Sequence, residues 1–208
     1  DNRDSGIPVS AHTLIAPQHF ILATRETGYR SVATAVAELI DNAIQAKASD
    51  INVFVLDCAT CNVNRIEEGK IMIAVLDNGE GMDHATLWTA LQFGGTGRFN
   101  DRSSLGRFGM GLPNSSVSQS RRVEVYSWDR SGSILFSYLD VDEVAQRALD
   151  EVPVPIPRAL PTWASHAVGR TGTLVVWPKC DRLNFRRAST VAQKLRTPLG
   201  RMYRHLIW

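Results

Sequence analysis

The chain has 208 residues, of which 44% are hydrophobic and 21% are charged. This is an ordinary composition for a globular protein, with enough apolar material for a substantial core in one large domain or two small ones. No apolar run approaches the roughly 18 residues that would span a bilayer, and the polar first residues lack a signal-peptide pattern.

The charge is distributed unevenly along the chain. The net charge is +2, but the segment from Lys179 onward has eight basic residues and one acidic residue, Asp181, so it carries +7 and the rest carries −5. A basic helical end can be a phosphate-binding patch, or it can be a solvated helix face. The charge pattern leaves both interpretations open.

Of the three cysteines, Cys58 and Cys61 form a C-x-x-C pair. No second pair completes a four-ligand zinc site, so we interpret both as ordinary thiols at the end of a strand. A reducing compartment such as the cytoplasm fits this cysteine usage best.

The predicted elements begin after an N-terminal arm or edge strand at residues 1–18, which contains two prolines and little periodicity. Apolar residues then recur at helical spacing from about residue 30 to residue 48, and Glu38 and Asn42 share another face of that helix. Strands are predicted at 51–56 and 71–76.

Asp83 is a typical helix N-cap, and we expect a helix from there to about Phe93. Residues 94–111 are rich in Gly, Ser and Arg, and such a long loop inside a compact domain is usually functional. A short helix is expected near Met110, with Pro113 in the first turn, where proline is tolerated.

The second half of the chain predicts a hairpin, a small helix, a strand and a basic helix. They are strands at 123–128 and 133–139 joined around 129–132, a helix at 142–149, a Pro-rich link at 153–161, a strand at 173–177 and the basic helix at 186–206. This order favours an α+β fold with helices on one face of a largely antiparallel sheet.

Four motifs carry the functional prediction, and the first is Glu38-Leu-Ile-Asp-Asn42-Ala-Ile-Gln-Ala46. Helical spacing places Glu38 and Asn42 one turn apart on the same side. A carboxylate there could polarise a water molecule, and an amide oxygen could ligate Mg²⁺. A solvated acidic face is the alternative.

The second motif, Asp77-Asn-Gly79-Glu-Gly81-Met82, follows an apolar strand directly. Its glycines would let the backbone approach a flat ligand, and Asp77 could accept a hydrogen bond from an exocyclic amine. The same pattern is also a common turn.

The third motif, Gly106-Arg-Phe-Gly109-Met-Gly111-Leu112, lies between the long loop and a helix, where backbone N–H groups can cradle phosphate. Its spacing is neither the dinucleotide fingerprint nor a P-loop. The fourth, Arg170-Thr-Gly172-Thr173, enters a strand and is weak alone.

Together and in this order, these motifs resemble the N, G1, G2 and G3 boxes of the GHKL superfamily, over about residues 34–177. The resemblance implies the Bergerat fold, a two-layer α/β sandwich with a mixed, mostly antiparallel sheet. It also implies an ATPase that binds Mg-ATP and hydrolyses it to ADP and phosphate as the nucleotide-gated module of a larger machine.

By the same resemblance, Glu38 would be the general base, Asn42 the Mg²⁺ ligand and Asp77 the acceptor that recognises adenine. Residues 94–107 would form a lid over ATP. The implied cofactor-binding residues are Asn42, Asp77, Gly79, Gly81, Met82, Gly106, Phe108, Gly109, Met110, Gly111, Leu112 and Thr173.

Within the superfamily, sensor histidine kinases usually lack a glutamate at the position of Glu38, so its presence favours hydrolysis over phosphotransfer. An ATP-binding switch without turnover and a histidine-kinase-type phosphotransferase are the alternatives. The sequence from Gly106 to Ser116, together with that from Asp77 to Met82, looks most like MORC-type proteins and their bacterial relatives.

Two features depart from the family pattern. Gln45 stands where many relatives have an acidic residue, and we expect the downstream transducer domain, whose lysine reaches the γ-phosphate, to be absent from this chain. We therefore expect residues 1–18 to be an arm and residues 19–208 to be one ATP-binding domain that hydrolyses ATP slowly and is largely monomeric in isolation.

The partners implied are ATP, a second copy in an ATP-dependent homodimer formed through the arm and the lid, and nucleic acid bound by the basic helix or by missing domains. No membrane partner is expected.

Overall fold

The computed structural model describes residues 16–57, 71–94, 110–165 and 169–205. These residues form a six-stranded sheet with the order β1-β2-β6-β3-β4-β5, in which all neighbouring strands are antiparallel. The helices are α1 (Pro17–Thr27), α2 (Val32–Gln45), α3 (His84–Ala90), α4 (Gly111–Gln119), α5 (Val141–Ala145) and α6 (Ala188–Met202), and the strands are β1 (Ile51–Asp57), β2 (Ile71–Asp77), β3 (Arg122–Trp128), β4 (Leu135–Asp140), β5 (Ile156–Pro157) and β6 (Gly172–Cys180).

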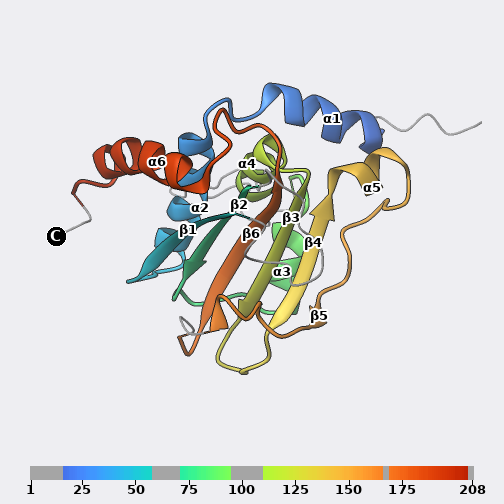
Figure 1. Ribbon diagram of the computed structural model, residues 1–208. Coiled ribbons are helices and arrows are strands. Elements are labelled where there is room, and N and C mark those ends of the chain that lie inside the picture. Colours follow the sequence, from blue (N-terminus) through green and yellow to red (C-terminus); the bar gives the residue numbers. More distant parts are fainter. Residues whose placement is uncertain (1–15, 58–70, 95–109, 166–168, 206–208) are drawn as a thin grey trace, which may run out of the picture.

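The helices cover one face of the sheet, as Figure 1 shows, so the predicted α+β sandwich is confirmed. Ile73, Val75 and Trp177 point to this face and pack with residues of the helices. Among the described residues, no helix is long and apolar enough to cross a membrane.

The Pro-rich link covers the second face of the sheet. Its prolines by themselves predict only a connecting segment and not this packing. Leu160, Trp163 and Ala164 pack against Met72 and the other residues of this face. Because apolar residues cover both faces, all seven residues of β2 are buried, and the strand is a continuous apolar run from Ile71 to Leu76 that ends in Asp77.

Helix α1 is not apparent from the sequence pattern, which places its first two residues in the arm. Pro17 occupies the first turn, where its missing N–H costs nothing, and Ile21, Thr24 and Arg25 are buried. The Arg25 guanidinium donates to the Val117 carbonyl at 2.8 Å and pairs with Asp181. Because the apolar face of α1 is narrow, these tertiary contacts hold the helix in place.

The predicted helix starts are confirmed in three places. The Ser31 hydroxyl accepts from Ala33 N at 3.2 Å at the start of α2, and the Asp83 carboxylate accepts from Thr86 N at 2.8 Å at the start of α3. Pro113 lies in the first turn of α4. Helix α3 ends at Ala90, a few residues before the predicted end.

Helix α6 lies beside β1 and α2 and extends away from the sheet (Figure 1). Ala188, Val191 and Leu195 form its buried side, and Ala188 N donates to the Asp57 carboxylate at 3.3 Å. At its other end the Tyr203 hydroxyl lies 2.8 Å from Ala37 O and 2.8 Å from Asp41 Oδ1 on α2. Burial and Asp41 raise the pKa of Tyr203.

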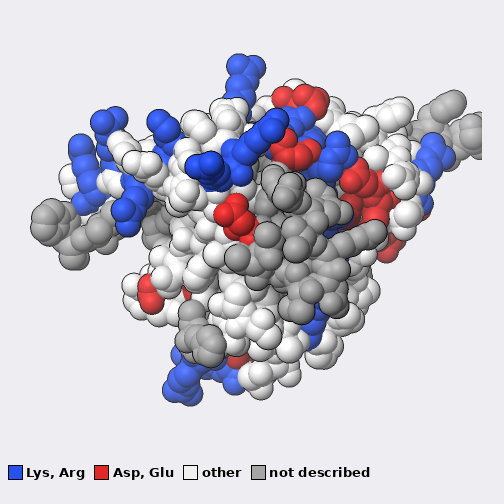
Figure 2. Space-filling view, viewed as in Figure 1, with Lys and Arg blue, Asp and Glu red and all other residues white. Residues whose placement is uncertain are grey.

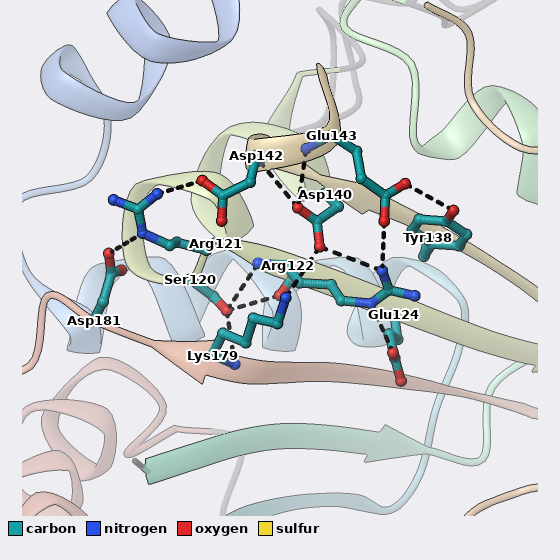
Figure 3. A network of polar contacts seen from close by, with 10 residues as sticks. All are labelled: Ser120, Arg121, Arg122, Glu124, Tyr138, Asp140, Asp142, Glu143, Lys179 and Asp181. Atoms are coloured by element: carbon teal, nitrogen blue, oxygen red, sulfur yellow. Dashed lines mark hydrogen bonds and ion pairs between the residues drawn. The ribbon is translucent and has the colours of Figure 1, made fainter. Parts of the chain in front are cut away.

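A polar network joins the ends of β3, β4 and β6 to α5 (Figure 3). Asp140, which is 2% exposed, accepts from the backbone N–H groups of Asp142 and Glu143 and lies within 3.4 Å of Arg122 and Lys179. The network holds three strand ends together without using any residue of the predicted site.

Candidate functional site

The first and third motifs meet at one carboxylate. Glu38, half-buried on α2, places its Oε1 against Gly111, the first residue of α4: an added Cβ at Gly111 would lie 1.9 Å from that oxygen. The other oxygen, Oε2, accepts a hydrogen bond of 2.9 Å from the Tyr29 hydroxyl. A side chain at position 111 would force the flexible end of Glu38 to move, so glycine here lets the carboxylate lie next to the helix N-terminus.

Asn42 lies one turn beyond Glu38 and is half-buried. No hydrogen bond joins its side-chain amide to another of the described residues. The described residues contain no group of three His, Cys, Asp or Glu side chains that could hold a metal ion. A cation at Asn42 would need oxygens from a ligand or from water, which is how Mg²⁺ is commonly bound.

Asp77 is the first residue of the second motif and the last residue of β2, and it is 8% exposed. Its Oδ1 accepts from Gly79 N at 2.8 Å. Burial raises the pKa of Asp77, against the opposing effect of the backbone N–H groups of Gly79 and Thr173. The carboxylate is thus a buried acceptor with only part of its hydrogen-bonding capacity used.

Close contacts with the protein's own backbone require glycine at both glycine positions of the second motif. An added Cβ at Gly79 would lie 2.8 Å from Ala46 O, and one at Gly81 would lie 2.0 Å from Trp128 O. Gly81 also has a φ of +73°, a conformation that favours glycine. These contacts fix the turn after β2 against α2 and β3.

Ser127 connects the second and fourth motifs, although it belongs to neither. Its hydroxyl accepts from Met82 N at 2.8 Å, donates to Gly172 O at 3.1 Å and lies 2.9 Å from the Thr173 hydroxyl. Thr173 itself is the sheet partner of Asp77. The structure thus brings Asp77, Met82 and Thr173 together across three strands.

Two further residues without a predicted role brace this region. The Thr171 hydroxyl donates to Gly79 O at 2.6 Å. Asn78 Oδ1 accepts from the backbone N–H groups of Ser49 and Asp50, both at 2.9 Å, and so ties the turn between α2 and β1 to the end of β2. Asn78 lies inside the second motif, which is the one signal that could have marked it.

Of the predicted phosphate-binding residues, Met110, Gly111 and Leu112 lie at the start of α4 and are partly exposed. Gly106, Phe108 and Gly109, and all of the predicted lid except Gly94, lie outside the described residues. Cys58 and Cys61 lie outside them as well.

Two cavities lined by described residues lie elsewhere. One of about 890 Å³ runs between α2, β1 and α6, and one of about 550 Å³ lies between α1, α3 and α5. Neither is lined by Glu38, Asn42 or Asp77. The candidate site is therefore defined by its polar side chains and not by either of these two cavities.

The fold and this arrangement define a nucleotide-binding ATPase domain of the GHKL class. The family model described as "Histidine kinase-, DNA gyrase B-, and HSP90-like ATPase" matches residues 29–170, and the chain belongs to that family.

Its relatives include MORC-type proteins, as the second motif, the third motif and the residues after the third predict. The chain is 32% identical to ATPase MORC2B of Mus musculus over 146 residues, which are 69% of this chain and 13% of that protein. It is 29% identical to ATPase MORC2 of Homo sapiens over 145 residues, 68% of this chain and 13% of that protein.

A shorter similarity links the chain to the DNA mismatch repair protein MutL of Streptococcus pyogenes serotype M5 (strain Manfredo). It is 42% identical over 76 residues, which are 36% of this chain and 10% of that protein. The chain therefore spans only a small part of the curated relatives that it matches, and the activities of those whole proteins do not transfer to it directly.

Proposed function

We propose that the chain binds Mg-ATP between α2, the turn after β2 and the start of α4, and hydrolyses it to ADP and phosphate as the nucleotide-gated module of a larger machine. The observation that carries this proposal is the contact between Glu38 and Gly111. It places a candidate base beside a helix N-terminus, where backbone N–H groups favour phosphate.

In this proposal the adenine lies at the end of β2. Asp77 accepts a hydrogen bond from the exocyclic amine, and Thr173 supports the ring from the neighbouring strand, with Gly79, Gly81 and Met82 as the wall. The partly satisfied, buried carboxylate of Asp77 supports this assignment, because a buried acceptor needs a donor.

Glu38 takes the proton from the water that attacks the γ-phosphate, and the amide oxygen of Asn42 is the protein's ligand to the cation. Bound Mg²⁺ would supply positive charge beside the phosphates. The position of Asn42 on α2, one turn from Glu38, supports this division of roles.

The alternatives are an ATP-binding switch without turnover and transfer of phosphate to a protein side chain. ATP labelled at the γ-phosphate separates all three. Hydrolysis yields free labelled phosphate, phosphotransfer yields labelled protein, and a switch binds ATP with neither product. Label appearing on protein would contradict the proposal, and so would binding without release of phosphate in the full-length protein.

We propose nucleic acid as a second partner, bound by a basic surface on α6 and its flanks. Among the described residues, no ion pair neutralises the basic side chains that form this surface: Arg186, Arg187, Lys194, Arg196, Arg201 and Arg204. No acidic residue follows Asp181 in the sequence. Figure 2 shows the Lys and Arg side chains over α6 with no acidic side chain among them. The basic residues of the polar network, Arg121, Arg122 and Lys179, all pair with carboxylates.

A further inference from the structure

Tyr29, in the loop between α1 and α2, binds one of the two oxygens of Glu38. Its hydroxyl donates to Oε2 at 2.9 Å, and the residue is half-buried. Burial and the hydrogen bond to Glu38 raise the pKa of Tyr29 to about 12. The hydroxyl therefore stays protonated and remains a donor throughout the neutral pH range.

The two oxygens of Glu38 have different surroundings. Oε2 is anchored by Tyr29, whereas Oε1 faces Gly111 at the start of α4, where no side chain intervenes. A glutamate side chain has three rotatable bonds, so a single anchored oxygen restricts strongly where the other oxygen can point. The anchored arrangement directs Oε1 toward the predicted phosphate site.

Tyr29 is itself held by helix α4. Gln119 Nε2 donates to Tyr29 O at 2.6 Å. The preceding residue, Gly28, packs so closely that an added Cβ would lie 2.7 Å from Asn114 Oδ1 and 3.0 Å from Ser118 Cβ. The helix that begins at Gly111 thus also fixes the loop that carries the Tyr29 hydroxyl.

We propose that Tyr29 is a positioning residue that orients Glu38, so that Oε1 can accept the proton of the attacking water while Oε2 is held. This inference rests on the proposed role of Glu38 as the general base. The base oxygen must lie within about 2.6–3.2 Å of the water oxygen whose proton it removes, and small misplacements of a catalytic group can cost up to about 100-fold in rate.

A double-mutant cycle in the full-length protein tests the proposal through Tyr29→Phe, Glu38→Gln and the combination. Tyr29→Phe keeps the ring and removes only the donor. We expect it to lower kcat for ATP about tenfold, while KM and the Kd of a non-hydrolysable ATP analogue stay within about twofold. In the Glu38→Gln background, which has no base to orient, Tyr29→Phe should leave the residual rate unchanged.

A purely structural role for Tyr29 gives a different result, namely equal losses in both backgrounds together with weaker nucleotide binding. That outcome overturns the proposal, as does an unchanged or higher kcat in Tyr29→Phe. If Glu38→Gln alone retains full turnover, the proposed function of Glu38 is wrong, which is a separate failure.

Gln119→Met provides a second variant, which removes the donor to the Tyr29 carbonyl and leaves both Tyr29 and Glu38 in place. It should lower kcat in the same direction by a smaller factor, again without raising KM. If Tyr29→Phe does not fold, this variant decides the question, and an unchanged kcat in a folded Gln119→Met protein then overturns the proposal.

Discussion

Asp77 is buried at the end of β2, and one of its carboxylate oxygens accepts a hydrogen bond from Gly79 N. The site therefore favours a ligand that presents a hydrogen-bond donor to Asp77 over one that presents an acceptor. We expect the site to prefer ATP over GTP, because guanine has a carbonyl where adenine has its amine. Two buried acceptors facing each other cost about 1–3 kcal/mol. Titration calorimetry with both nucleotides would measure the preference.

Asp77→Asn should weaken ATP binding strongly in the same measurement. Asp83→Asn is the matched control, since Asp83 caps α3 from the exposed surface and asparagine can keep the cap. Equal affinity for ATP and GTP would show that Asp77 does not distinguish adenine from guanine.

Glu38 and Asn42 should separate chemistry from binding. Glu38→Ala should keep ATP affinity and lose about 10²–10⁴-fold in turnover, the usual contribution of general-base catalysis. Asn42→Ala should instead reduce the part of the affinity that depends on Mg²⁺. Steady-state turnover and analogue binding with and without Mg²⁺ would measure both, and loss of binding in a folded Glu38→Ala protein would contradict the assigned roles.

At the scale of elements, the turn after β2 depends on Gly81, which has a positive φ and contacts Trp128 O closely. Gly132 in the β3–β4 turn has a φ of +83° but nothing within 4 Å of an added Cβ. Gly132→Ala should therefore cost about 1 kcal/mol of unfolding free energy from backbone strain alone. Gly81→Ala should cost clearly more unfolding free energy, because β3 must also move. Urea unfolding of both variants would measure the difference. Equal losses of unfolding free energy in the two variants would contradict this prediction.

The polar network predicts a pH dependence of stability through Asp140. Burial opposes ionisation of Asp140, but the Glu143 backbone N–H, Lys179 and Arg122 outweigh it and hold its pKa below the usual value. Because the folded-state pKa is lower than the unfolded-state value of about 3.9, the stabilisation is complete above that value and is lost as the pH falls through the folded-state pKa.

Asp140→Asn should accordingly be less stable than the parent at pH 7 by about 1–3 kcal/mol, with the difference shrinking as the pH approaches about 2. Urea unfolding at a series of pH values would measure it. The exposed Asp150→Asn is the control and should follow the parent throughout. A constant difference at all pH values would mean that the charge of Asp140 is not what stabilises the network.

At the scale of the whole molecule, positive charge collects on α6 and its flanks, which contribute none of the predicted ATP-site residues. We expect Lys194→Gln combined with Arg201→Gln to weaken binding to duplex nucleic acid. The salt dependence of the binding constant should also become shallower, by up to about 0.9 in slope for each phosphate that the variant no longer neutralises. Fluorescence anisotropy at several salt concentrations would measure both effects.

Arg130→Gln combined with Arg147→Gln removes the same charge from exposed positions far along the chain from α6 and serves as the control. ATP-analogue binding should be unchanged in both pairs. Equal effects of the two pairs on nucleic-acid binding would indicate a response to net charge, and the surface over α6 would then have no special role.

Strong local patterns made much of the fold predictable from the sequence. Helix α2 has the apolar periodicity of a helix with one buried face, β2 has the continuous apolar run of a strand that is buried on both faces, and the predicted cap at Asp83 is a local interaction between neighbouring residues. Helix α1 and the cover formed by the Pro-rich link do not follow from such patterns, because Arg25 and Trp163 are buried by segments distant in sequence.

The candidate site likewise has some features that the sequence predicts and others that only the folded structure shows. The order of the four motifs can be read directly along the chain, and it indicates the family and residues such as Glu38 and Asp77. That Tyr29 anchors Glu38, and that Ser127 joins Met82 to Thr173, became visible in the folded structure alone. Those partners come from other strands and loops, and a hydrogen bond between distant segments leaves no periodic pattern in the sequence that specifies it.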